Sequence, residues 1–203
     1  METSTIAHPP ATLEGWYALH QIFRVDPRRV PPARLRTMLT SAMTTLEKAS
    51  TAAASRKSKK SPQDPQRGWS CVAKLVGSTA DAMIIHFRDS LDAIDVAQSQ
   101  VAATALGKVV EPVYAFLSVT EAGLYHVTAD LARRAEDRGG KVGDEEFSRE
   151  LADRAAAELA SPHVRRRLYP DLPTGKPYVS FYPMSKRRNP DDNWYTLSLD
   201  ERS

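Results

Sequence analysis

The order in which strand-like and helix-like patterns follow one another constrains this chain more than any single motif. Six segments differ in apolar periodicity, and turn-forming residues separate them. Their order is strand, helix, strand, strand, helix, strand, at residues 16–25, 32–50, 69–76, 81–88, 91–105 and 109–119. This order is typical of a ferredoxin-like unit, in which helices cover one face of an antiparallel sheet. We therefore predict an α+β domain over residues 14–127.

Both predicted helices have one apolar face. The first follows Pro31, and the second follows Asp89-Ser90, which can cap it, while Gly107 is expected to end it. Pro112 lacks an N–H group, so the last strand should lie at a sheet edge or carry a bulge. The apolar positions repeat at spacings of three and four: Leu35, Met38, Leu39, Ala42, Leu46 and Ala49, then Leu91, Ile94, Ala97, Val101 and Ala105.

Two flanking regions carry weaker signals. Residues 1–13 contain few large apolar side chains and are expected to form a flexible arm. Residues 128–165 are expected to form a connecting helical segment. There Gly139-Gly140 breaks the chain, Asp144 caps a helix and Pro162 ends it.

The stretch from Tyr178 to Tyr195 is rich in side chains that contact ligands. Tyr178 to Met184 has the β-branched and aromatic content of a strand, and Pro183 places it at an edge or a bulge. A lone strand cannot bury its own faces, so we predict that this segment is the first strand of a second sheet. Residues 186–188 then supply three cations. Residue types alone leave open either a buried strand with a solvated basic turn or a surface for a flat, anionic ligand.

Composition argues against several functions. The chain has 28 Lys+Arg against 25 Asp+Glu, a balance that gives little reason to expect nucleic-acid binding. It lacks a long apolar run and a signal-like N-terminus, so we expect neither membrane insertion nor export. The single cysteine, Cys71, fits a reducing compartment, and we expect a cytoplasmic protein. The basic residues 55–65 are either a solvated loop or a contact for an anionic partner.

The histidines have no recognisable metal-ligand spacing. Histidines that stand alone in strands and loops are more often structural or solvated than ligands. We therefore predict no metal ligand among His8, His20, His86, His126 and His163.

Several motifs together resemble the chlorite dismutase family, in particular its peroxide-dependent coproheme decarboxylase branch. Gly15–His20 resembles the opening strand, Gly77–Met83 the central hairpin, and Ser118–Glu121 the end of the fourth strand. Arg167-Leu168-Tyr169-Pro170 follows, and then FYPM-x-K-x-R with NWY, which is the most specific part. The similarity runs in order from about Glu14 to Arg202.

The resemblance implies an architecture larger than this sequence. Family members have two ferredoxin-like halves, assemble into rings that are often pentamers, and hold haem or coproheme in the second half. The proximal histidine and most of that half would lie beyond the residue matching Arg202. We therefore expect the N-terminal half only. A second chain would carry the haem-bearing half and the iron ligand in a hetero-oligomeric ring, unless the sequence is a fragment of a longer protein.

The resemblance also suggests site residues. Positions matching Arg167, Tyr182 and Lys186 lie at the propionates, where Tyr182 would act as the radical that abstracts hydrogen. A guanidinium and an ammonium suit carboxylates, and a phenol can lose a hydrogen atom. Tyr169 would assist binding. Met184 and Trp194 would pack near the macrocycle or fill core.

These expectations define a subunit that converts coproheme to haem b with hydrogen peroxide, releasing CO2, and that is inactive alone. One alternative is a non-catalytic structural or binding subunit of a chlorite dismutase-like hetero-oligomer. Another is a chlorite dismutase-like haem oxidoreductase, although the distal arginine that chlorite-degrading members need has no match in this chain.

Overall fold

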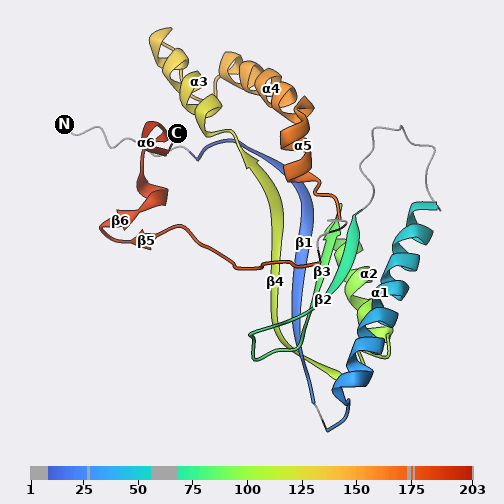
Figure 1. Ribbon diagram of the computed structural model, residues 1–203. Coiled ribbons are helices and arrows are strands. Elements are labelled where there is room, and N and C mark those ends of the chain that lie inside the picture. Colours follow the sequence, from blue (N-terminus) through green and yellow to red (C-terminus); the bar gives the residue numbers. More distant parts are fainter. Residues whose placement is uncertain (1–8, 27, 56–67, 173–174, 176, 203) are drawn as a thin grey trace. The chain divides into compact units, whose positions relative to one another are not determined.

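The computed structural model describes residues 9–26, 28–55, 68–172, 175 and 177–202 (Figure 1). The chain divides into two compact units. One comprises residues 15–120 and 169–179, and the other comprises the N-terminal residues up to Glu14, residues 121–168 and residues 180–203. The predicted arm at 1–13 and the basic run at 55–65 lie largely outside the described residues.

The first unit contains an antiparallel sheet with two helices. Its strands lie in the order β2-β3-β1-β4, and β3 pairs antiparallel with both β1 and β2. The position of β4 at the sheet edge confirms the prediction from Pro112. The ferredoxin-like order is confirmed by β1 (Thr12–Val25), α1 (Pro32–Ser55), β2 (Trp69–Lys74), β3 (Ala82–Arg88), α2 (Leu91–Ala103) and β4 (Val110–Gly123).

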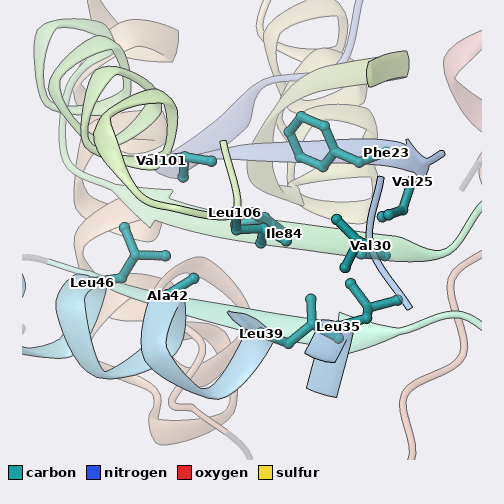
Figure 2. Close-up of a cluster of buried hydrophobic side chains, with 11 residues drawn as sticks. Phe23, Val25, Val30, Leu35, Leu39, Ala42, Leu46, Ile84, Val101 and Leu106 are labelled. Carbon is teal, nitrogen blue, oxygen red and sulfur yellow. The ribbon is translucent and has the colours of Figure 1, made fainter. Parts of the chain in front are cut away.

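Strand alternation divides the sheet into two faces. One face carries Phe23, Ala82 and Ile84, which share a buried cluster with α1 and α2. Figure 2 shows this cluster, in which apolar side chains of both helices meet the sheet. The opposite face carries Trp16, whose ring meets Tyr169 edge to face at 5.7 Å. Both helices therefore cover the same face, as predicted.

Local signals set both ends of α2. The Ser90 side chain accepts a hydrogen bond from the Ala93 N–H and caps α2. This helix ends at Ala103, before the expected stop at Gly107, because the Thr104 hydroxyl donates to the Val101 carbonyl and its N–H does likewise.

The second unit contains two packed helices and a short C-terminal region. Helix α3 (Tyr125–Asp137) packs on α4 (Glu145–Ala160) through a small core of Leu131, Ala135 and Phe147. The Asp144 cap is confirmed, since its carboxylate accepts from the Phe147 N–H at 2.8 Å. The chain continues through α5 (Pro162–Leu168), β5 (Arg188–Asn189), β6 (Asp192–Asn193), the 3₁₀ helix η1 (Trp194–Thr196) and α6 (Leu199–Arg202).

The predicted strand from Tyr178 to Met184 is wrong. Residues 177–187 have no regular secondary structure, and the residues that follow form only the two-residue pair β5–β6. A strand exists only when a neighbouring strand pairs with its backbone, and Pro183 removes one donor. No neighbouring strand pairs with this stretch in the part of the chain that the structure describes.

Candidate functional site

The segment carrying Tyr182 and Met184 is exposed. The side chain of Tyr182 is 67% accessible and that of Met184 is 83% accessible. A phenol in this position can meet a ligand without displacing packed side chains. The exposure argues against the interpretation of Tyr178–Met184 as a buried barrel strand.

Lys186 and Trp194, which were both predicted as site residues, are in contact with each other. The ammonium nitrogen of Lys186 lies 2.9 Å from the centre of the Trp194 ring and 5.3 Å from that of Tyr125. The Tyr125 and Trp194 rings meet edge to face at 5.6 Å. A cation over an aromatic face is attracted by the ring quadrupole. We call Tyr125, Lys186 and Trp194 the cation–aromatic cluster.

More cations surround this cluster. The Arg202 guanidinium lies 5.4 Å from the Trp194 ring centre, and that of Arg188 lies 4.6 Å from the Tyr195 ring centre. Arg188 also donates a hydrogen bond to the Tyr195 hydroxyl at 3.1 Å. Arg187 forms an ion pair with Asp192 across the β5–β6 turn. The C-terminal region thus places cations on aromatic rings, although residues 186–202 carry four basic and four acidic residues in all.

Arg167 and Tyr169 are placed by separate elements. Arg167 lies in the last turn of α5, and its Nε–H donates to the Glu121 carbonyl at 2.8 Å. Tyr169 belongs to the first unit, where it packs on Trp16. Each of these two residues is therefore held by a contact within its own unit, and neither contact involves Lys186.

The sequence prediction missed Tyr125 and Arg202 as members of this surface. Arg188 and Tyr195 belong to the stretch predicted to contact ligands, but their contact with each other was not predicted. Tyr125 is remote in sequence from Lys186 and Trp194, so no local pattern could link them. The pair Arg188–Tyr195 had a usable signal, because the Asn-Pro-Asp-Asp turn between them folds the chain back on itself.

His86 forms part of a buried polar network in the sheet. Ser70 Oγ and His86 Nδ1 are 2.8 Å apart, and Arg88 donates to Ser70 Oγ at 2.7 Å. The pKa of His86 is lowered to about 3, chiefly by burial and additionally by the charges of Arg88 and His20. Burial also lowers the pKa of His20. No group of three potential metal ligands occurs among the described residues.

No helix in the described ranges combines the length and hydrophobicity needed to cross a bilayer.

Known proteins resemble this chain over most of its length. The family model for chlorite dismutase matches residues 41–203. A protein of Haloarcula marismortui, named as an inferred haem-binding protein, is 34% identical over 96% of this chain and 25% of its own length. A Natronomonas pharaonis protein with the same kind of name is also 34% identical, over 96% of this chain and 28% of its own.

A solved structure is also similar. It is described as a novel haem-binding protein from Thermus thermophilus, with a TM-score of 0.65 and 26% identity, over 97% of this chain and 65% of that one. This chain spans only about a quarter to two thirds of the proteins it matches.

Proposed function

This chain belongs to the chlorite dismutase family, and we propose that it serves in the peroxide-dependent conversion of coproheme to haem b. The observation that carries the proposal is the exposed segment from Tyr182 to Lys186, which lies within the family match. It presents a phenol and, four positions later, an ammonium group held on an aromatic surface. Carboxylates bind such cations, and a phenol can both hydrogen-bond and give up a hydrogen atom.

The donor set fits the carboxylate edge of a porphyrin. Among the residues proposed for it, Arg167 and Lys186 are cationic and exposed, and neither forms an ion pair with a described residue. Arg167 uses its Nε–H on the Glu121 carbonyl and keeps the two terminal nitrogens for a carboxylate. We assign propionate binding to these two residues, with Tyr169, Met184 and Trp194 as the further contacts to the bound group.

The described histidines are poorly placed to act as the iron ligand. His86 is fully buried in the sheet and hydrogen-bonded to Ser70, and His20 is half-buried on the opposite face of the sheet, where its ring meets Phe87. His126 and His163 are exposed helical residues that match no known ligand position. We therefore assign the iron ligand to a polypeptide segment other than the described residues, supplied by a second chain in a ring-shaped hetero-oligomer.

Tyr182 is the residue to which we assign chemistry. When bound, the iron porphyrin supplies the oxidising power of hydrogen peroxide. Each propionate becomes a vinyl group as it loses CO2, one proton and two electrons, and these electrons with two protons convert one peroxide into two waters. The phenol of Tyr182 would first give up its own proton and electron to the peroxide-derived oxidant, and the resulting tyrosyl radical would take a hydrogen atom from the propionate chain and so restore the phenol. Arg167 and Lys186 would hold the carboxylate and fix its orientation.

A binding role without catalysis is the second candidate. The relatives from Haloarcula and Natronomonas carry names that speak of haem binding alone. In that case the same cations would hold the porphyrin and Tyr182 would have no chemical part. The third candidate is a haem oxidoreductase of the chlorite dismutase type, which membership of the family also supports.

Mass spectrometry distinguishes these candidates. The chain is purified from its own cells with any polypeptide that accompanies it, and coproheme and then peroxide are added. Loss of two carboxyl groups supports the decarboxylase. Stable coproheme binding with no mass change supports the binding subunit. In a separate sample given chlorite, oxygen release measured with an oxygen electrode supports the third candidate. If coproheme does not bind at all, the proposal fails.

A further inference from the structure

A groove runs along the outer flank of α1, between this helix and the edge strand β2. Its volume is about 1140 Å³, large enough for a small-molecule ligand. Helix α1 contributes a stripe from Ala33 to Glu47, and β2 contributes Val72 and Lys74. All of these residues lie within the first unit. The groove therefore shares no residue with the C-terminal surface to which haem chemistry was assigned.

The floor of the groove is apolar because the core is incompletely covered there. Figure 2 shows Leu35, Leu39, Ala42 and Leu46 in line along α1. Ala42 and Leu46 are 1% and 0% accessible, whereas Leu35 and Leu39 toward the start of the helix retain 8% and 9%. Val72 is only partly buried against the same cluster. Apolar surface left accessible in a concave site favours an apolar ligand.

Short side chains keep the groove open. Thr40 and Thr44 occupy the wall where a longer residue would fill the space. The Thr40 hydroxyl donates to the Arg36 carbonyl and that of Thr44 to the Thr40 carbonyl, each at 3.1 Å. Their protons are therefore used within the helix, and their methyl groups add to the apolar wall. A ligand must find its polar contacts elsewhere.

The groove is lined by two cations and two carboxylates. Arg36 and Lys74 line it, are exposed, and form no ion pair with any other described residue. The carboxylate of Asp81 accepts the Val25 N–H at 2.7 Å, which fixes its position and leaves its negative charge in place, so that Arg36 and Lys74 together outweigh it by one charge. Glu47 lies about three helical turns from Arg36, at the far end of the stripe. One end of the groove is thus suited to an anion and the rest to an apolar chain.

We propose that this groove binds an amphipathic carboxylate with an extended alkyl tail. The carboxylate contacts Arg36 and Lys74, and the tail lies along Leu39, Met43 and Val72. Two cations with a carboxylate give charge-assisted hydrogen bonds, and each methylene that enters the floor adds apolar burial. This site goes beyond the proposed haem function and does not depend on it.

Calorimetric titration of the full chain with alkyl carboxylates tests the proposal. Octanoate, decanoate and dodecanoate are added below their micelle concentrations, and dodecylammonium is the charge-reversed control. Each added methylene should tighten Kd by about three- to fourfold. Dodecylammonium should bind at least about tenfold more weakly than dodecanoate, because Arg36 and Lys74 repel its ammonium group.

Matched variants locate the site. Lys74→Gln and Arg36→Gln should each weaken dodecanoate binding by about tenfold, whereas Arg34→Gln, an exposed cation outside the groove, should leave it unchanged. Thr40→Trp should fill the groove and abolish binding, whereas Thr37→Trp, one turn away and outside the groove, should not. Thermal melting of every variant verifies that it folds.

Three outcomes would overturn the proposal. The first is no binding of any alkyl carboxylate. The second is equal binding of dodecanoate and dodecylammonium, or binding that Thr40→Trp leaves intact, since either indicates nonspecific adsorption. The third is displacement of dodecanoate by an apolar peptide that binds equally well to the Arg36→Gln and Lys74→Gln variants. That result would indicate that the groove accepts a peptide strand paired with β2.

Discussion

The ferredoxin-like core and the C-terminal segment differ in what holds their side chains in place. In the core, residues such as Leu46 and Ile84 are fully buried and contact one another across α1 and the sheet. In residues 177–202, Tyr178, Tyr182 and Met184 are largely exposed, and the ordered contacts are between cations and rings. The core is stabilised by burial of apolar area, and the segment by a few electrostatic contacts at the surface.

This difference separates stability from function along one chain. Substitutions in the core should change the free energy of unfolding and affect activity only through the amount of folded protein. Substitutions in the C-terminal segment should change ligand chemistry and leave unfolding nearly unaffected. The predictions that follow test this division, from the largest effect to the smallest.

Leu46→Ala should destabilise the protein by about 2–5 kcal/mol, because it leaves a cavity in a fully buried site. Denaturant unfolding measures the change. Val96→Ala, at a position that is 56% accessible on α2, is the control and should change the value by less than about 0.5 kcal/mol. Equal effects of the two variants would contradict the core described for the first unit.

Tyr182→Phe should slow decarboxylation about 100-fold or more, equivalent to about 2.7 kcal/mol of transition-state stabilisation, because the phenolic hydrogen is lost. Coproheme binding and the melting temperature should stay within error, since the side chain is exposed. Single-turnover mass spectrometry provides the measurement.

Lys186→Ala is the contrasting variant. It should weaken coproheme binding and spare the chemical step, because it removes a charge and keeps the phenol. Normal turnover by Tyr182→Phe in a complex that does decarboxylate coproheme would remove this tyrosine from the mechanism.

Acid should destabilise the core through His86. Its folded pKa of about 3 lies below the unfolded value near 6.5. The unfolded state therefore binds more protons between these values, so the stabilisation is complete above pH 6.5 and is lost as pH falls. The expected loss is about 1.4 kcal/mol per pH unit, or about 2 kcal/mol at pH 5. Chemical unfolding at a series of pH values measures it.

His86→Gln isolates this histidine from the other acid-sensitive groups. It should flatten the pH dependence below 6.5, whatever its effect on stability at pH 7. His163→Gln removes an exposed histidine and should keep the full slope. An unchanged slope in His86→Gln would show that another group controls acid unfolding.

Trp194→Leu should lower the free energy of local unfolding of the C-terminal segment by about 0.5–1 kcal/mol. The substitution removes the aromatic face under Lys186 and the contact with Tyr125. Faster amide exchange over residues 186–202, with an unchanged global melting temperature, is the expected result. Tyr178→Leu, at a position that is 91% accessible, should leave exchange unaltered. A fall in global stability would place Trp194 in the core.

The sequence by itself determined the order of the elements in the first unit and several of their ends, although β1 begins at Thr12, α1 continues to Ser55 and β4 to Gly123, each four or five residues beyond the prediction. Apolar spacing on α1 and α2, the caps at Ser90 and Asp144, and Pro112 on the edge strand are local signals, and the structure follows them. The family motifs likewise identified the chlorite dismutase family, which the match over residues 41–203 shows.

Only the tertiary structure decided how the candidate site residues are arranged. Residues 178–184 have the composition of a strand but do not form one in this structure. Strand formation depends on a neighbouring strand, which composition does not specify. The meeting of Lys186 with Trp194 and Tyr125, and the groove left open beside Thr40 and Thr44, depend on how distant segments pack. Periodicity along a chain reports which face is buried, whereas packing determines which residues meet.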